Sequence, residues 1–129
     1  MAESEYNINL LTYNVTGLRS DAKRLAIFQY IIQKNIDICF LQETHSIEGD
    51  VDKWKNEWGG DIYLSHGTNL ARGVMILFKP SFDVNVLSIR TDNEGRLLYL
   101  EIQSQNEKFK LLNVYAPNFD LQQRNYFLI

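Results

Sequence analysis

The sequence predicts an α/β fold, because a strand, a helix and a second strand follow one another near its start and a series of short strands comes after them. The 129 residues are 45% hydrophobic and 22% charged, which is the composition of a folded globular chain rather than a disordered or fibrous one. We therefore expect one domain, or part of one.

The first and third elements are expected to be neighbouring strands. Residues 7–13 carry strand-like apolar side chains and break at Asn14, with Gly17 following as a turn residue. Residues 36–41 are almost continuously apolar, as expected of a strand covered on both faces. A helix between two such strands favours a parallel pairing.

The helix between them has a start signal and a stop signal. Ser20 can cap its first turn, Asp21 suits that turn, and Asn35 can end the helix. Its apolar residues form a broad stripe that we expect to face a core. The stripe consists of Leu25, Phe28 and Ile32, with Ile27 and Ile31 beside them.

A short helix and five strands are expected next. Val51, Trp54 and Trp58 have helical spacing, and the pattern stops at Gly59 and Gly60, so both tryptophans are expected in the core. The strand-like segments that follow are separated by turn residues and indicate antiparallel hairpins. They span residues 62–64, 74–78, 84–89, 97–102 and 109–115.

Charge and hydropathy narrow the classes of function. Thirteen basic and sixteen acidic residues give a net charge of −3, which is unlike a protein that holds nucleic acid mainly by charge. The single Cys39 cannot form an internal disulfide and favours a reducing setting. The start of the chain is acidic, unlike a signal peptide, and no apolar stretch approaches the about 20 residues of a membrane helix. We expect a soluble intracellular protein with no membrane partner.

Three apolar runs end in side chains that can bind a metal ion or a phosphate. Asn14 ends the first run, and Glu43 follows the second in "FLQETH". Tyr115 and Asn118 follow the last run in "LLNVYAPN", where Pro117 turns the chain out of the sheet. If these ends converge, their oxygen atoms suit Mg²⁺, with substrate phosphate oxygens completing its coordination.

Each of these residues also has an ordinary structural explanation. Glu43 could be a solvated strand end and Tyr115 a half-buried strand aromatic. Asn14 and Asn118 could serve turns. Polar residues end most strands, so the pattern alone leaves both interpretations open.

Five segments that cover nearly the whole chain carry a more specific signal. They are "LLTYNVTGLRSDAKR", "IDICFLQETHS", "WKNEWGGDIYLSHGTNLARGVMILF", "DNEGRLLYLEI" and "LLNVYAPNFDLQQRNYF". In this order they resemble the start of the endonuclease domain of LINE-type (non-LTR) retrotransposons. That domain belongs to the endonuclease/exonuclease/phosphatase superfamily, alongside apurinic/apyrimidinic endonucleases.

The resemblance implies a four-layer α/β sandwich, with two mixed β-sheets flanked by helices, that hydrolyses DNA phosphodiesters with Mg²⁺ or Mn²⁺. Glu43 would be the metal-binding carboxylate, with Asn14 beside the metal and the nucleophile. Tyr115 and Asn118 would face the scissile phosphate and stabilise its developing charge. DNA would be the partner, and the nucleus the expected location.

Some features depart from the superfamily pattern. Thr16 and His45 stand where the apurinic/apyrimidinic branch has Asp and Lys, which favours the retrotransposon branch. The downstream Gly-Asp-Phe-Asn motif and the terminal Asp-His pair are absent. We therefore expect residues 1–129 to be an incomplete domain without its C-terminal part, and to be a poor catalyst alone, because the base and the histidine of the reaction are missing.

Two other functions stay open. The chain could be a truncated, non-catalytic module that binds DNA or associates with itself through a surface left bare, since its "NYFLI" end is apolar. It could also be a superfamily phosphatase that acts on a lipid headgroup, although "HGTNLARG" and "YAPNFD" favour the retrotransposon branch.

Several other polar residues keep two interpretations. Arg19, Lys23 and Arg24 could meet a DNA backbone or form a solvated helix start. His45 and His66 receive no assigned role. Arg72 and Gly73 are expected in a hairpin turn, where the glycine permits a tight bend.

Overall fold

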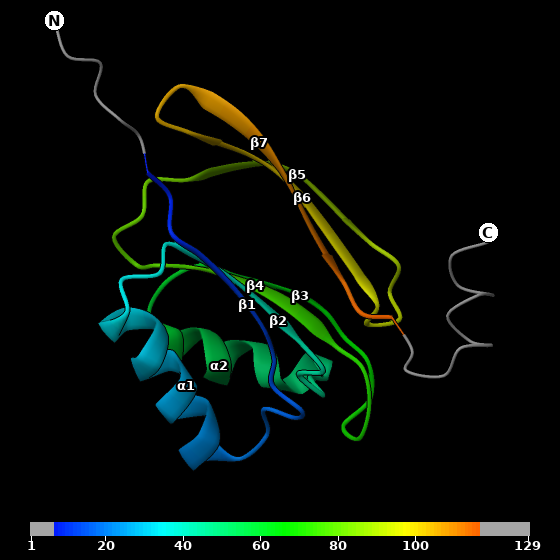
Figure 1. The fold of residues 1–129 in the computed structure, drawn as a ribbon. Coiled ribbons are helices and arrows are strands. Elements are labelled where there is room, and N and C mark those ends of the chain that lie inside the picture. Colours follow the sequence, from blue (N-terminus) through cyan, green and yellow to red (C-terminus); the bar gives the residue numbers. More distant parts are fainter. Residues whose placement is uncertain (1–6, 117–129) are drawn as a thin grey trace, which may run out of the picture.

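The computed structural model describes residues 7–116, and within them seven strands form two sheets while two α-helices cover one sheet (Figure 1). A single 3₁₀ turn, η1, precedes the second helix. The elements are β1 (Leu10–Asn14), α1 (Asp21–Gln33), β2 (Ile38–Gln42), η1 (Glu48–Asp50), α2 (Val51–Trp58), β3 (Ile62–Ser65), β4 (Val74–Phe78), β5 (Asn85–Thr91), β6 (Leu97–Ser104) and β7 (Glu107–Val114).

The first sheet is mixed and has the strand order β1-β2-β4-β3. β1 and β2 run parallel, with Asn14 opposite Gln42, so the predicted strand, helix and parallel strand are confirmed. β4 runs antiparallel to both β2 and β3. All five residues of β4 are buried, because both faces of this strand are covered.

The second sheet has the order β5-β6-β7 and is antiparallel throughout. It packs across the first sheet, and both helices lie on the opposite face of that first sheet (Figure 1). The expected α/β class with two face-to-face sheets is therefore confirmed. In the part of the chain that the structure describes, however, only one sheet is mixed, because β5, β6 and β7 are joined by two successive hairpins.

One of the predicted hairpins does not form. The segment 79–84 leaves the first sheet after β4 and enters the second sheet at β5, so these two strands do not pair. The β3–β4, β5–β6 and β6–β7 pairs are antiparallel as predicted. This crossover carries the chain from one layer of the sandwich to the other.

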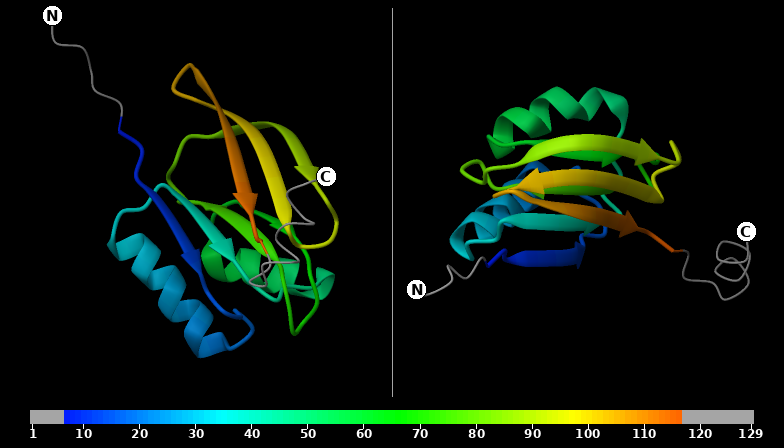
Figure 2. Two further views of the ribbon diagram at one scale, coloured as in Figure 1. Left: turned by 45° about the vertical axis from the view of Figure 1, so that its right-hand side comes forward. Right: turned by 90° about the horizontal axis from the view of Figure 1, so that it is seen from above.

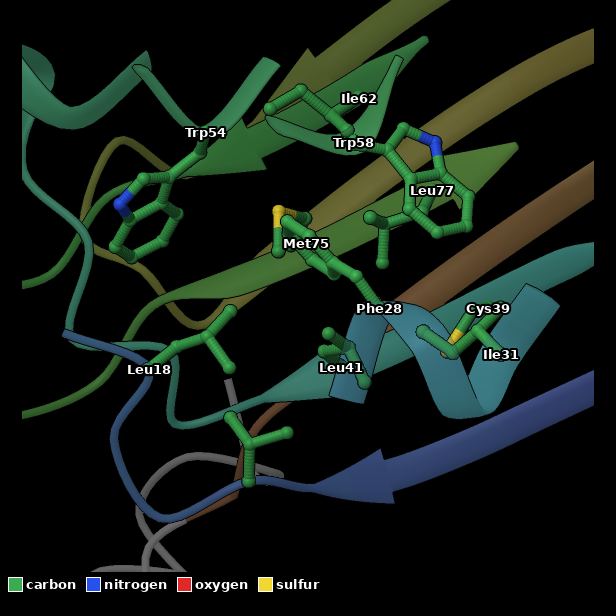
Figure 3. Close-up of a cluster of buried hydrophobic side chains, with 11 residues drawn as sticks. Leu18, Phe28, Ile31, Cys39, Leu41, Trp54, Trp58, Ile62, Met75 and Leu77 are labelled. Atoms are coloured by element: carbon green, nitrogen blue, oxygen red, sulfur yellow. The ribbon is translucent and has the colours of Figure 1, made fainter. Parts of the chain in front are cut away.

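The core on the helix side is built around two tryptophans (Figure 3). Trp54 and Trp58 are buried as predicted, and the Trp58 indole donates a hydrogen bond of 2.8 Å to the Phe78 carbonyl. Phe28 meets Trp58 edge to face, with ring centroids 5.3 Å apart. Burial raises the pKa of the Cys39 thiol to about 12, so this cysteine packs as a neutral apolar residue.

The predicted apolar stripe of α1 is partly wrong. Ser20 caps the helix as expected, but Leu25 and Ile32 are 42% and 44% exposed. The buried residues of α1 are Arg24, Phe28 and Ile31, which are spaced four and three residues apart on one face. Phe28 and Ile31 of the predicted stripe therefore face the core, with Ile27 packed beside them, while the buried face is rotated slightly away from Leu25 and Ile32 and towards Arg24.

Arg24 explains this rotation. Its side chain is fully buried and binds both carboxylate oxygens of Glu57 in α2, at 2.8 and 2.9 Å. It also donates to the Leu18 carbonyl at 3.1 Å, and its guanidinium lies 5.2 Å from the ring centroid of Trp54. Because a buried guanidinium needs a partner for each donor, this network fixes which face of α1 points inward.

Neither helix of the described part is long and apolar enough to cross a lipid bilayer.

Candidate active site

The ends of β1 and β2 stay together beyond the first sheet. The amide of Val15 donates to the Gln42 carbonyl at 2.9 Å, and the amide of Gly17 donates to the Glu43 carbonyl at 2.7 Å. Asn14 is the last residue of β1 and Glu43 is the first residue after β2, so the chain leaves the sheet at the same end in both places. The convergence predicted for these two strand ends is found.

The end of β7 is brought to the same place by a buried amide. Asn113, which is 2% exposed, donates from Nδ2 to the carbonyls of Leu41 in β2 and Met75 in β4, at 3.0 and 2.9 Å. Its Oδ1 accepts a hydrogen bond of 2.8 Å from Gln42 Nε2. One side chain thus connects the two sheets. Tyr115 follows two residues later, so it continues on the same side of the chain as Asn113.

Tyr115 consequently meets Glu43. Burial raises the pKa of Tyr115, and the negative charge of Glu43 and a hydrogen bond to its carboxylate raise that pKa further. Arg96 and Arg72 act in the opposite direction through their positive charges. At neutral pH the phenol is therefore protonated, and two of the four predicted site residues lie close enough to affect each other electrostatically.

Asn14 and Tyr115 line one open cleft of about 660 Å³ between the two sheets. Gln42 and Asn113 contribute amides to the same cleft, and Leu112 contributes apolar surface. Figure 2 shows why the cleft is open: β1 lies at the margin of the first sheet and β7 at the margin of the second, on the same side of the molecule. Asn118, the fourth predicted site residue, lies outside the described residues.

Asn14 also serves the local turn. Its Oδ1 accepts hydrogen bonds from the Thr16 amide at 3.0 Å and the Thr16 hydroxyl at 3.3 Å. This is the side-chain turn that asparagine commonly makes after a strand. The structural interpretation left open by the sequence is therefore present, and it orients the amide at the rim of the cleft.

The loop before β4 is hydrogen-bonded to the loop after β2. The amides of Thr44 and His45 donate to the carbonyls of Gly73 and Arg72, at 3.0 and 2.8 Å. A Cβ on Gly73, whose φ is +95°, would lie only 2.3 Å from the Thr44 hydroxyl, so the tight bend predicted here requires glycine. Glu43, His45 and Arg72 also have positive φ values of 56°, 57° and 63°.

These left-handed residues store backbone strain beside the strand ends. A residue with a side chain loses roughly 1 kcal/mol in this conformation. Strain of this kind gathers at sites where function constrains the backbone. The positive charges of Arg72 and Arg96 lower the pKa of Tyr115. The sequence did not identify either arginine as a site residue. The only signal at these positions is the neighbouring glycine in "LARG" and "NEGR".

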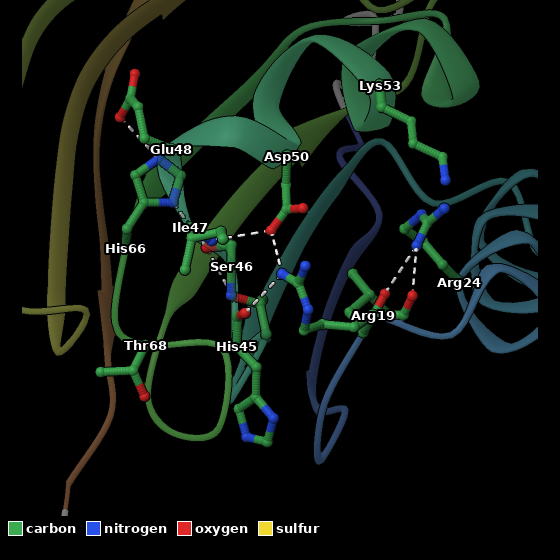
Figure 4. A network of polar contacts seen from close by, with 12 residues as sticks. Arg19, Arg24, His45, Ser46, Ile47, Glu48, Asp50, Lys53, His66 and Thr68 are labelled. Atoms are coloured by element: carbon green, nitrogen blue, oxygen red, sulfur yellow. Dashed lines mark hydrogen bonds and ion pairs between the residues drawn. The ribbon is translucent and has the colours of Figure 1, made fainter.

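The two histidines take part in structural contacts (Figure 4). His66 Nδ1 lies 2.9 Å from the buried Ser46 hydroxyl, and its Nε2 lies 3.4 Å from the Glu48 carboxylate. The His45 ring lies against Gly17, where a Cβ would stand 3.0 Å from Nδ1. Both side chains therefore brace the loops around the strand ends.

The basic cluster near the helix start is largely neutralised within the fold. Arg19 forms an ion pair with Asp50 (Figure 4). Lys23 Nζ donates to the Thr16 carbonyl at 3.1 Å. Arg24 is buried with Glu57. Of the three residues considered for contact with a DNA backbone, Arg24 is therefore unavailable, and Arg19 and Lys23 already have partners.

The contact between Tyr115 and Glu43 has a measurable consequence. We expect Glu43→Gln to lower the pKa of Tyr115 towards its ordinary value, because the substitution removes the negative charge that disfavours the phenolate. Nuclear magnetic resonance of ring-labelled tyrosine during a pH titration measures this pKa.

Glu101→Gln is the matched control for that titration. Glu101 accepts a hydrogen bond of 2.8 Å from Tyr99 and raises its pKa, so this substitution should move Tyr99 and leave Tyr115 unchanged. An unaltered Tyr115 titration in Glu43→Gln would show that the two side chains are not in contact.

Two curated relatives match most of the chain. A transposon TX1 protein of 149 kDa from Xenopus laevis is 32% identical over 120 residues, which is 93% of this chain but 9% of that protein. An exodeoxyribonuclease from Bacillus subtilis is 26% identical over 115 residues, or 86% of this chain and 43% of the enzyme. The chain thus spans less than half of the length of either relative.

Solved structures match the fold. The AP endonuclease LMAP from Leishmania major superposes with a TM-score of 0.68 at 19% identity, over 92% of this chain and 44% of that one. D. rerio TDP2 in complex with a single-strand DNA product gives a TM-score of 0.67 at 21% identity, over 94% of this chain and 51% of that one. At these identities the likeness supports the arrangement of sheets and helices and nothing further.

A family model covers almost the entire chain. The model describes the endonuclease/exonuclease/phosphatase family and matches residues 5–128. The transposon relative agrees with the resemblance to a retrotransposon domain. The two packed sheets, the converging strand ends and this match together place the chain in the endonuclease/exonuclease/phosphatase family.

Proposed function

We propose that this chain is the N-terminal part of an endonuclease domain that hydrolyses phosphodiester bonds of DNA. The observation that carries the proposal is the convergence of three strand ends beside an open cleft, where Asn14, Glu43 and Tyr115 follow β1, β2 and β7 and the Glu43 carboxylate raises the pKa of Tyr115. A family member with such a site is suited to binding a phosphate ester and stabilising charge on its oxygens.

The oxygen ligands at the ends of β1 and β2 are of the chemical type that binds Mg²⁺ or Mn²⁺. Glu43 offers a carboxylate, and Asn14 offers an amide oxygen once the Thr16 hydroxyl gives up its bond of 3.3 Å to that atom. Both are hard oxygen ligands of the kind that these ions prefer. Residues 7–116 contain no group of three or more His, Cys, Asp or Glu side chains that could hold an ion by themselves. Glu43 and Asn14 would therefore need water or phosphate oxygens as further ligands. When bound, the ion supplies positive charge against the developing charge on the phosphate.

Tyr115 contributes hydrogen bonding rather than proton abstraction. Its raised pKa keeps the phenol protonated at neutral pH, so it can donate to a phosphate oxygen but cannot act as a base there. Asn118 is expected to add a second donor.

We assign no residue of the described part to the activation of water. In the described part the only carboxylate in contact with Tyr115 is Glu43, which we assign to the metal ion. We therefore propose that residues 1–129 are an incomplete domain with little activity, and that the family's downstream sequence supplies the base. The share of the Bacillus relative that is matched, 43%, supports this view.

The names of the relatives favour DNA over a lipid headgroup as substrate. One relative is a transposon protein and another an exodeoxyribonuclease, and one structural neighbour holds a DNA product. A protein that cleaves genomic DNA in a nucleated cell would act in the nucleus.

The central test is DNA nicking by a polypeptide that carries this chain together with the rest of its domain. We expect Glu43→Ala to slow the nicking of supercoiled plasmid by about a hundredfold or more, because a positioned charge acting on the reacting phosphate is lost. Chelation of divalent ions should stop the wild-type reaction.

Glu107→Ala serves as the control, since Glu107 is an exposed carboxylate at the far end of β7. It should nick as fast as wild type. Nicking that survives Glu43→Ala would contradict the proposal.

A second candidate role is self-association of the short chain. Leu10, Tyr13 and Leu112 are 57%, 53% and 56% exposed along the free edges of β1 and β7, and exposed apolar edges promote pairing between chains. We expect a dimer in sedimentation that Leu112→Lys weakens. A monomer at every concentration would exclude this role.

A further inference from the structure

Arg72 carries two unfavourable features that the fold does not explain. Its backbone is left-handed, with φ of 63°, although it bears a long side chain. Its Nε is buried and has no hydrogen-bond partner among the described residues. A buried donor without a partner destabilises a fold by about 1–3 kcal/mol, so two such features at one residue call for a compensating role.

The position of Arg72 indicates what that role is. Its carbonyl accepts the His45 amide at 2.8 Å, so the residue is anchored two positions from Glu43 in the loop after β2. Its positive charge also lowers the pKa of Tyr115, which places the two side chains near each other. Arg72 therefore lies on the loop between β3 and β4, near the Tyr115 phenol and the Glu43 carboxylate.

Arg96 reaches the same tyrosine but is already occupied. Both arginines have a buried Nε without a hydrogen-bond partner. They differ in their ion pairs: Arg96 Nη1 lies 2.8 Å from the Glu94 carboxylate, whereas Arg72 forms no ion pair within residues 7–116. A guanidinium on the loop next to Glu43 that has no ion-pair partner within the described residues can bind an external anion through its Nη atoms, because Nε is buried. The planar fork of arginine matches two oxygens of a phosphate group.

We propose that Arg72 binds a phosphate of the DNA backbone next to Glu43 and Tyr115, through the two Nη atoms of its guanidinium. This inference rests on the proposed function for its choice of DNA, and it assigns to the β3–β4 loop a contact that positions the strand. Arg72 is a positioning residue: it holds a phosphate and takes no part in bond cleavage.

The test measures binding of a fluorescent duplex to the chain, by anisotropy, over a series of salt concentrations in the presence of a chelator. Arg72→Gly suits the left-handed backbone, so this variant is expected to fold with an unfolding midpoint equal to or above that of wild type. Its affinity should fall about tenfold at low salt. The slope of log affinity against log salt should become shallower by about 0.9, the value for one lost phosphate contact.

Two further variants separate the fork from simple charge. Lys108→Gln removes one positive charge at the far, exposed end of β7 and should leave both affinity and slope unchanged. Arg72→Lys keeps the charge without the fork, so it should retain the slope but bind more weakly than wild type.

The opposite results would overturn the inference. Absence of salt-dependent binding by the wild-type chain, or an Arg72→Gly variant with the wild-type slope, would show that Arg72 contacts no phosphate. A large fall in the unfolding midpoint of Arg72→Gly with unchanged binding would assign it a structural role. Binding is measured without divalent ions, so a failure of Glu43→Ala to affect nicking would refute the proposed function and leave this result intact.

Discussion

The site depends on one buried amide that connects the two sheets. Sheets packed face to face are held mainly by apolar contacts, which fix their separation but allow sliding. Asn113 fixes the position of one sheet relative to the other, because its amide group must bond to the carbonyls of Leu41 and Met75 and to the side chain of Gln42 at the same time. All three bonds together fix the placement of β7 over β2 and β4, and that placement brings Tyr115 near enough to Glu43 for the carboxylate to raise the pKa of the phenol.

Close backbone approaches complete the arrangement around the strand ends. The Gly73 amide donates to the Gly95 carbonyl at 2.9 Å, and the Tyr115 amide donates to the Arg96 carbonyl at 2.8 Å. A Cβ on Gly95 would lie 2.6 Å from the Gly67 amide, so glycine is required where these loops meet. Three loops from two sheets are thereby held together, and the left-handed conformations of Glu43 and Arg72 are tolerated because the surroundings fix them.

Local patterns in the sequence predicted the elements well, since period and turn chemistry are local properties. The parallel β1 and β2, the two core tryptophans and the convergence of Asn14 and Glu43 all follow from such patterns. The inward face of α1 did not, because the buried pair of Arg24 and Glu57 joins residues 33 positions apart. Asn113 and Arg72 were missed for the same reason: their importance lies in partners on other strands and loops, which no local pattern contains.

The most direct test of this account is the effect of Asn113→Ala on Tyr115. The variant removes the hydrogen bonds of Asn113 to two buried carbonyls and to Gln42, which keeps its bonds to Thr12 and Phe40, so the free energy of unfolding should fall by about 2–4 kcal/mol. Tyr115 should then move away from Glu43, and its pKa should fall towards the ordinary value, which nuclear magnetic resonance can follow. The control is Asn85→Ala, at an exposed amide in β5, which should change neither the free energy of unfolding nor the pKa of Tyr115. A folded Asn113→Ala protein in which Tyr115 titrates as in wild type would contradict the claim that this amide positions the site.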